Sequence, residues 1–98
     1  MKDRSCFFED QAKLDISEAY DWYLKNASLR VAESFLNEIE ESVNYIVQDG
    51  LLFKKIHKDY RQVPIKIFPF VIIYKLDTYV IKIYRIFSTN KDPNSKIL

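Results

Sequence analysis

Apolar residues recur every three or four positions along the first half of the chain, which is the spacing of one face of an α-helix. A first helix is predicted over residues 10–25, with an apolar stripe formed by Ala12, Ile16, Ala19, Tyr20 and Tyr23. A second, longer helix is predicted over residues 28–48, with an apolar stripe formed by Ala32, Phe35, Leu36, Ile39, Val43, Ile46 and Val47. Because the link between them is short, we expect the helices to be antiparallel neighbours.

Two residues near the helix ends suggest where each helix begins or stops. Asp10 is a candidate N-cap of the first helix. Gly50 is the only glycine of the chain and follows Asp49. Helix C-termini favour glycine because it tolerates a positive φ angle, so we expect Gly50 to end the second helix in that conformation.

After the second helix the period of the pattern changes to two, which is typical of strands. Apolar residues alternate with other residues over 62–67, and the stretches 70–76 and 79–87 are rich in β-branched and aromatic side chains. These stretches are predicted strands. Pro64 cannot donate a ladder hydrogen bond, so its strand is expected at an edge of the sheet or to be irregular there. A further short strand is expected around residues 5–8.

Together these elements predict an α+β fold with the order (β)ααβββ, in which an N-terminal helical hairpin packs on a small antiparallel sheet. The chain has 98 residues, so residues 1–98 are expected to form a single domain. With 48% hydrophobic residues, the composition is that of a folded protein and not of a disordered one.

The scarcity of cysteine and histidine limits the available chemistry. Cys6 and His57 are each the only residue of their kind, so no internal disulfide and no zinc site are expected, and no cofactor is indicated. No run of about 18 apolar residues is present, and the N-terminus lacks the apolar segment of a secretory signal. We therefore expect a cytoplasmic protein that does not associate with membranes.

Charge is divided between the two halves of the chain, although the net charge is only +1. Residues 1–49 hold five Lys or Arg against eleven Asp or Glu, a net charge of −6, whereas residues 50–98 hold ten against three, a net charge of +7. The sign changes where the pattern changes from helix to strand. We interpret this as an acidic helical layer on a basic sheet with separate partners; the alternative is that each half only solvates its own surface.

Four stretches, in chain order, carry a resemblance to a known family. They are AKLDISEAYDWY (12–23), FLNEIEESVNYI (35–46), YRQVPIKIFPFVIIYKL (60–76) and IYRIFSTNKDP (83–93). They resemble the RelE/ParE superfamily of toxins from bacterial type II toxin–antitoxin systems, and the ParE branch most. The resemblance implies a role in plasmid stabilisation and growth arrest through binding of DNA gyrase. It also implies a cognate antitoxin received by an apolar groove between helices and sheet, in a toxin–antitoxin hetero-oligomer or beside a homodimer.

Two departures from the family pattern bear on catalysis. Ser88 stands where many relatives have histidine, and Asn90-Lys91 stands where the tip usually has two basic residues. RelE-like relatives cleave messenger RNA on the ribosome without a metal, which requires a base, an acid and cations around the phosphate. Cations are present, but Ser88 does not titrate near neutral pH and His57 lies in a lysine-rich stretch before the sheet. The residues therefore favour binding over catalysis.

The candidate target-binding residues are Arg61, Lys66, Arg85, Ser88, Asn90 and Lys91. Arg85 has an alternative role in an ion pair with an acidic helix residue, and Lys66 that of an ordinary exposed lysine. Trp22 and Tyr20 cannot both share the helix stripe with Tyr23, so one of them is expected to face a partner. Three hypotheses stay open: a ParE-like toxin that binds gyrase, a RelE-like ribosome-dependent endoribonuclease that cleaves mRNA, and a degenerate, non-toxic interaction module.

Overall fold

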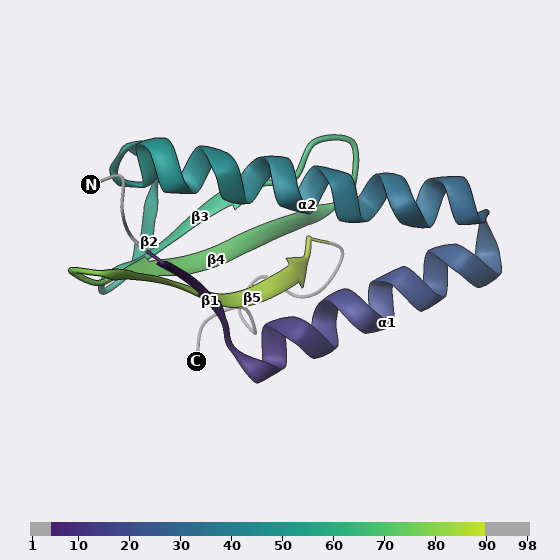
Figure 1. Ribbon diagram of the computed structural model, residues 1–98, viewed down its shortest axis with the longest axis horizontal. Helices are drawn as coiled ribbons and strands as arrows, with labels where there is room; N and C mark the ends of the chain where they lie inside the picture. Colours follow the sequence, from purple (N-terminus) through teal and green to yellow (C-terminus); the bar gives the residue numbers. More distant parts are fainter. Residues whose placement is uncertain (1–4, 90–98) are drawn as a thin grey trace.

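The computed structural model describes residues 5–89, which form two helices and a five-stranded sheet. In chain order the elements are β1 (Ser5–Phe8), α1 (Asp10–Asn26), α2 (Leu29–Asp49), the 3₁₀ turn η1 (Gly50–Leu52), β2 (Lys55–His57), β3 (Tyr60–Pro64), β4 (Phe70–Leu76) and β5 (Val80–Ser88). The helices are joined at one end into a hairpin, with α2 along the sheet and α1 on the side of β5 (Figure 1). The predicted α+β fold is confirmed.

The strand order in the sheet is β1-β5-β4-β3-β2, so β4 is the central strand. Neighbours among β2 to β5 are antiparallel, whereas β1 runs parallel to β5, with Ser5–Phe8 opposite Val80–Ile83. Parallel neighbours need a long crossover connection, and most of the chain lies between these two strands. The strand expected at residues 5–8 is confirmed. The pattern does not predict β2, because its three residues are too few to show a period.

The expectation that the strand containing Pro64 lies at an edge is wrong for the first residues of β3 and holds at Pro64 itself. The first residues, Tyr60 and Arg61, pair with β2 on the side away from β4. The N–H of Ile65 donates to the carbonyl of Phe70, toward β4, at 3.0 Å. Successive backbone groups of a strand alternate in direction, so the ring nitrogen of Pro64 points away from β4. Pro64 lies beyond the last residue of β3 that pairs with β2. No neighbouring strand therefore needs a hydrogen bond from its backbone nitrogen.

The core lies between the helix stripes and the sheet, as the two periodicities predict. Its most deeply buried large side chains are Phe35, Ile46, Ile72, Tyr74, Ile81, Ile83 and Ile86. Tyr23 packs with its ring centroid 5.2 Å from that of Phe68 and 5.4 Å from that of Phe35. Trp22 is instead 59% exposed, so it is the aromatic residue of α1 that faces outward.

The two helix starts differ in how their first N–H groups are satisfied. At α2, the Oγ of Ser28 accepts a hydrogen bond from the backbone N of Val31 at 3.1 Å, as an N-cap does. At α1, the N-cap is Glu9 and Asp10 is the first helical residue, so the prediction that Asp10 is the N-cap is wrong. The reason is that the backbone N–H of Glu9 still donates to the carbonyl of Ile83, on the neighbouring strand, at 2.9 Å. Strand pairing therefore continues through Glu9, and the helix begins at the next residue.

Gly50 follows α2 as predicted, but its expected positive φ angle is wrong. Its φ is −57°, because the chain continues into the turn η1 and does not reverse. A Cβ at this position would lie 3.2 Å from Cδ2 of Leu76, so a larger residue would have to displace the end of that side chain slightly. The carbonyl of Gly50 accepts a hydrogen bond from the buried Tyr74 hydroxyl at 2.6 Å. Burial raises the pKa of Tyr74 to about 12, against a smaller opposing effect of Arg61.

Candidate functional site

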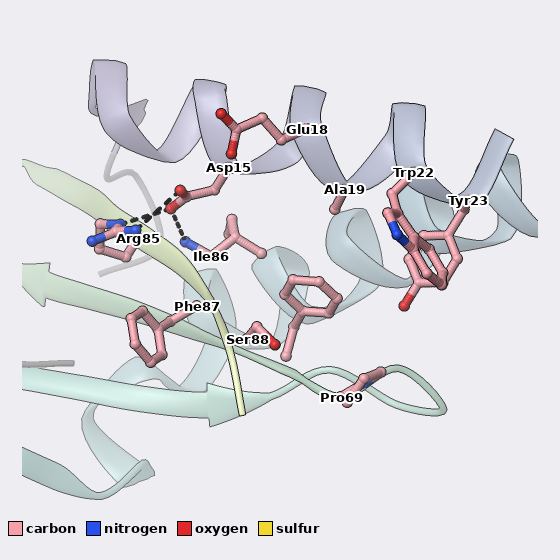
Figure 2. A pocket seen from close by; sticks show the side chains of 11 residues that line it. Asp15, Glu18, Ala19, Trp22, Tyr23, Pro69, Arg85, Ile86, Phe87 and Ser88 are labelled. Atoms are coloured by element: carbon pink, nitrogen blue, oxygen red, sulfur yellow. Dashed lines mark hydrogen bonds and ion pairs between the residues drawn. The ribbon is translucent and has the colours of Figure 1, made fainter. Parts of the chain in front are cut away.

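A groove of about 560 Å³ opens between α1 and the last residues of β5, a volume typical of ligand sites. The helix wall is made by Asp15, Glu18, Ala19, Trp22 and Tyr23. The opposite side is made by Pro69, Phe70, Arg85, Ile86, Phe87 and Ser88. Trp22 and Tyr23 project from α1 toward the loop at Pro69, and the small Ala19 lies between them and Glu18 (Figure 2). The groove is therefore aromatic and apolar at one end and charged at the other.

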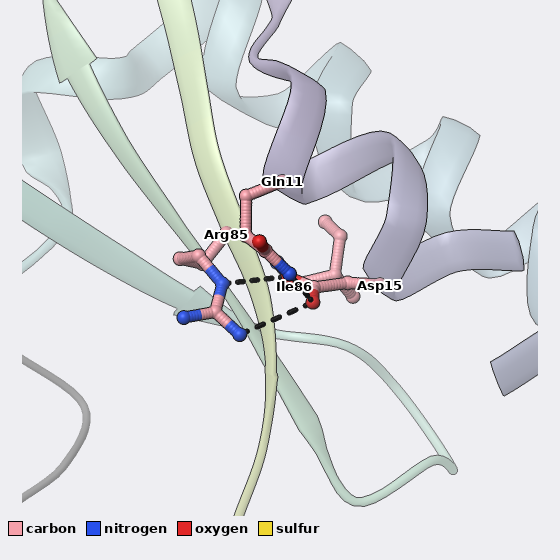
Figure 3. A network of polar contacts seen from close by, with 4 residues as sticks. All are labelled: Gln11, Asp15, Arg85 and Ile86. Atoms are coloured by element: carbon pink, nitrogen blue, oxygen red, sulfur yellow. Dashed lines mark hydrogen bonds and ion pairs between the residues drawn. The ribbon is translucent and has the colours of Figure 1, made fainter. Parts of the chain in front are cut away.

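At the charged end, the carboxylate of Asp15 joins α1 to β5. Its Oδ2 accepts a hydrogen bond from Nε of Arg85 at 2.7 Å, and its Oδ1 accepts one from Nη2 at 3.1 Å. The backbone N of Ile86 also donates to Oδ2 at 3.0 Å, and Nε2 of Gln11 donates to Oδ1 at 3.1 Å (Figure 3). Asp15 is only 8% exposed. Four donors on one buried carboxylate fix the position of the helix against the strand.

The alternative role predicted for Arg85, an ion pair with an acidic helix residue, is confirmed. The hydrogen bond to Asp15 raises the pKa of Arg85 above its ordinary value, although partial burial of the guanidinium acts in the opposite direction. The guanidinium carbon also lies 5.5 Å from the ring centroid of Phe87, close enough for a cation–π contact. The guanidinium of Arg85 is thus fixed by contacts with Asp15 and Phe87 of the same chain.

Asp15 covers a stretch of β5 that β1 does not reach. β1 pairs only with Val80–Ile83, so the N–H of Ile86 further along β5 has no strand beside it. A buried N–H without an acceptor is costly, and Asp15 supplies the acceptor. Sequence reasoning missed Asp15 because it is polar. The available signal was its position, three residues after Ala12 and four before Ala19, inside the apolar stripe.

The structure does not bring Arg61 and Arg85 together. Arg61 donates from Nη1 to the carbonyl of Phe53 at 2.8 Å and to a carbonyl of η1 at 3.2 Å, and so stabilises the chain that follows α2. Arg61 lies opposite Tyr74, which packs in the core beneath the helices, whereas Arg85 lies opposite Ile73, which packs in a separate cluster. Because paired residues share a face of a sheet, the two arginines leave the sheet on opposite faces.

Two of the remaining candidate residues, Lys66 and Ser88, belong to neighbouring segments near the end of β5. Ser88 is the last residue of that strand, and Lys66 is exposed in the loop between β3 and β4. The backbone N of Thr89 donates to the carbonyl of the last residue of this loop at 2.8 Å, which joins the two segments. Asn90 and Lys91 follow in sequence and lie outside the described residues.

The tip of the same loop exposes an aliphatic residue in an uncommon conformation. Ile67 follows Lys66, is 83% exposed and has a φ angle of 74°. Positive φ angles are rare for β-branched residues, and such strained conformations are concentrated at binding and active sites. An exposed cation beside an exposed, strained isoleucine marks this tip as a candidate contact surface.

The sheet face away from α2 carries cations and tyrosine rings. Lys75 and Lys82 lie opposite each other on β4 and β5. Nζ of Lys75 lies 5.9 Å from the ring centroid of Tyr60, whose ring is 5.2 Å from that of Tyr84. Lys75 and Lys82 therefore place two cations on this face, and Lys82 also pairs with Asp77 at 3.6 Å.

His57, the alternative candidate base, lies on β2, at the edge of the sheet opposite to β5 and the groove. Within residues 5–89, no three His, Cys, Asp or Glu side chains are placed to hold a metal ion together. Neither helix of this part of the chain has the length and apolar character that crossing a membrane requires.

The arrangement of a helical hairpin on this sheet is shared with solved proteins of toxin–antitoxin systems. A chain of the chromosomal ParDE system from P. aeruginosa matches with a TM-score of 0.78 and 20% identity, covering 90% of this chain and 98% of that chain. The YoeB dimer from Staphylococcus aureus matches with a TM-score of 0.62 and 20% identity, covering 87% and 95%. The E. coli DinJ–YafQ toxin–antitoxin complex matches with a TM-score of 0.63 and 14% identity, covering 90% and 94%. These likenesses define the fold.

The sequence identifies the family more specifically than these structural matches do. The model described as the ParE toxin of the type II toxin–antitoxin system parDE matches residues 7–93. The chain therefore belongs to the ParE toxin family. No curated protein matches it. The resemblance inferred from the four sequence stretches, with the ParE branch favoured, is confirmed.

Proposed function

We propose that this ParE-type toxin arrests bacterial growth by binding DNA gyrase in the cytoplasm and that a cognate antitoxin neutralises it. Membership of the ParE toxin family, over residues 7–93, supports the toxin role. The resemblance of the chain to the ParE branch points to gyrase as the target. No cofactor enters this proposal, because binding requires only a shaped and charged surface.

The observation that carries binding over catalysis is the state of Arg85. A RelE-like ribonuclease needs a cation free to stabilise the charged phosphorane, beside a base and an acid. Among the residues that line the groove, Arg85 is the cation, and two of its nitrogens already donate to Asp15. His57 lies at the opposite edge of the sheet. This geometry supports a contact surface better than a catalytic centre.

We assign the target contact to the end of β5 and the adjoining β3–β4 loop. Lys66 and Ser88 belong to the two segments that meet there. Asn90 and Lys91 follow Thr89 in the sequence, and we propose that they complete the contact. In this proposal Arg61 does not contact the target. It stabilises the segment that follows α2 through hydrogen bonds to the carbonyls of Leu51 and Phe53.

An antitoxin partner is supported by the exposed apolar surface of the helical hairpin. The exposed large hydrophobic residues of α1 and α2 include Leu14, Trp22, Leu24, Leu29 and Leu36. Binding of a partner would remove such side chains from water. The similar structures include a ParDE toxin–antitoxin system and a DinJ–YafQ toxin–antitoxin complex. A hetero-oligomer of toxin and antitoxin is therefore the assembly we propose, with a toxin homodimer as the alternative.

Induced expression of the full chain in bacteria tests the proposal. We expect growth to stop and chromosomal DNA breaks to accumulate while messenger RNA stays intact, and the purified protein to inhibit supercoiling by gyrase. Co-expression with the product of a short adjacent gene that encodes a DNA-binding head should restore growth. Cleaved message with intact DNA would instead establish the RelE-like ribonuclease. Continued growth at full expression would establish a degenerate interaction module.

A further inference from the structure

We infer that Ile67, at the tip of the β3–β4 loop, anchors the target contact by entering an apolar pocket on a protein. The inference rests on the proposed function, because only a toxin with a target has such a contact. It deepens that function by naming the side chain that is inserted and the chemistry of the surface that receives it. The neighbouring cation, Lys66, implies an acidic group at the rim of that pocket.

The first observation is the backbone conformation of Ile67. Its φ angle of 74° lies in the region that glycine and asparagine adopt readily. A β-branched residue is unfavourable there, because its Cβ crowds the backbone. Strain of this kind lowers the stability of the fold and persists only where the surrounding structure imposes it. Fold stability alone would therefore favour glycine or asparagine at this position.

The second observation is that the side chain of Ile67 does not stabilise the fold by packing. It is 83% exposed, the largest exposed fraction among the large hydrophobic side chains of residues 5–89. One exposed apolar residue is ordinary in a folded protein, but one that also strains the backbone is unfavourable in both respects. Burial against a partner would supply the stabilisation that the isolated chain lacks.

The third observation is that the residues on both sides hold the tip in place. Ile65 is buried, and its backbone N donates to the carbonyl of Phe70 at 3.0 Å. The ring of Phe68 packs against one aromatic ring of each helix, with centroid distances of 5.2 and 5.3 Å. The chain therefore leaves the core for two residues only, Lys66 and Ile67. A tip fixed in this way loses little conformational entropy when it binds.

The chemistry of the tip selects the kind of partner. An aliphatic side chain has no aromatic face to stack on a base and no group to hydrogen-bond its edge, so a protein pocket fits Ile67 better than a nucleic acid does. Lys66 is exposed and, among residues 5–89, has no ion-pair partner within 4.0 Å. Its charge is therefore available to an acidic group of the same partner.

Ile67→Asn separates the strain from the contact, because asparagine tolerates a positive φ angle but has no apolar side chain. We expect the midpoint of its urea unfolding to rise above that of the wild type. Its affinity for purified gyrase should fall by about tenfold or more, and its induced expression should no longer arrest growth. A residue with a purely structural role cannot give a more stable fold together with weaker binding. Ile67→Leu keeps an aliphatic side chain and should retain most of the affinity.

Leu52→Asn is the matched control, because Leu52 is 80% exposed and lies in η1, outside the loop. It should leave gyrase affinity within about twofold of wild type. The inference is overturned if Ile67→Asn binds gyrase and arrests growth as the wild type does, or if it unfolds at a lower urea concentration than the wild type. Equal weakening of binding by the two asparagine variants would overturn it as well.

Two further results would assign the tip to another partner and overturn the inference. The first is binding of the wild type to linear duplex DNA without gyrase that Ile67→Asn weakens, since the side chain is then a wedge between base pairs. The second is an Ile67→Asn variant that stays toxic and escapes neutralisation by the product of the adjacent gene.

The proposed function and the inference fail in different ways. A wild-type chain that does not arrest growth rejects the proposed function and the inference with it, whereas full toxicity of Ile67→Asn beside a toxic wild type rejects the inference alone. Growth arrest by a wild type that leaves gyrase active rejects gyrase as the target, and growth of the strain that expresses Ile67→Asn then decides the inference.

Discussion

Asp15 and Arg85 lie 70 positions apart in the chain, and their side chains meet with Nε of Arg85 2.7 Å from Oδ2 of Asp15. The contact joins the first helix to the last strand, and the same carboxylate accepts the N–H of Ile86. One residue of α1 therefore pairs a cation and covers the part of β5 that has no neighbouring strand.

Replacement of Asp15 by asparagine should destabilise the fold. The amide can still accept from Ile86, but Arg85 is left without its counter-charge in a position where its side chain is only 23% exposed. Loss of one partner of a buried pair costs about 3–5 kcal/mol, and partial exposure of Arg85 reduces this to about 2 kcal/mol. Urea unfolding followed by circular dichroism measures the change. Glu18→Gln, on the same helix but exposed, should change stability by less than about 0.5 kcal/mol, and equal stability of the two variants would contradict the role of Asp15.

The hydroxyl of Tyr74 should make stability depend on alkaline pH. Its pKa is raised to about 12 by burial, so the neutral form is favoured in the folded state. A raised pKa gives stability that is complete below the unfolded value near 10 and is lost as pH rises toward 12. Two pKa units correspond to about 2.7 kcal/mol. Thermal unfolding between pH 9 and 12 should show this loss in the wild type and its absence in Tyr74→Phe.

At neutral pH the wild type should be more stable than Tyr74→Phe. Tyr74→Phe leaves the carbonyl of the buried Gly50 without its donor, which costs about 1–2 kcal/mol. The variant should therefore be less stable at pH 7 and as stable as the wild type, or more so, near pH 12. Tyr79→Phe is the control, because Tyr79 is 78% exposed and should not alter the pH profile. Parallel pH profiles for wild type and Tyr74→Phe would refute the assignment.

Gly50→Ala distinguishes the observed conformation from the one expected at a helix C-terminus. The φ angle of −57° suits alanine, and the nearest obstacle is the flexible side-chain end of Leu76 at 3.2 Å. The gain from a less flexible unfolded chain and the cost of moving Leu76 should leave stability within about 1 kcal/mol of wild type. Chemical denaturation provides the measurement. A loss well above about 2 kcal/mol would indicate that Gly50 requires a positive φ angle after all.

The N-cap at Ser28 should matter more than Asp10. Ser28→Ala removes the acceptor of the Val31 N–H and should cost about 1 kcal/mol. Asp10→Asn removes no cap bond, because the N-cap of α1 is Glu9 and it makes no side-chain cap hydrogen bond. Its effect should stay within about 0.5 kcal/mol, from the weak charge interaction with the helix dipole. Comparable losses in the two variants would argue against this assignment of the helix starts.

Toxicity should depend on Lys66 and Lys91 and not on Arg85 alone. Lys66→Ala should weaken target binding by about 1 kcal/mol, or about fivefold in Kd, without altering stability. Lys91→Ala should behave in the same way. Growth after induction and inhibition of gyrase supercoiling are the measurements, with Lys25→Ala at the exposed end of α1 as the control. Full toxicity in the Lys66 and Lys91 variants combined would remove this surface from the proposal.

Much of the fold follows from the order of residues along the chain, because periodicity is a local property. The stripes of α1 and α2, the stretches that form β4 and β5 and the cap at Ser28 need only neighbours within a few positions. The ParE resemblance likewise depends on short stretches in order. Exposure of either Tyr20 or Trp22 is foreseeable too, since three aromatic residues within four positions cannot share one helix face, but the choice of Trp22 is not.

The sequence by itself therefore determined the class of fold, the family and the separation of acidic helices from a basic sheet. Tertiary structure alone decided that Asp15 is buried, that Arg85 is paired, that Arg61 stabilises the end of α2 and that Gly50 is helical. These outcomes depend on which strand edge lies beside which helix face. The residues that form the hydrogen bonds concerned are 8 to 71 positions apart in the chain. A local pattern records the chemistry of each residue but not the identity of a partner that only folding brings within hydrogen-bond distance.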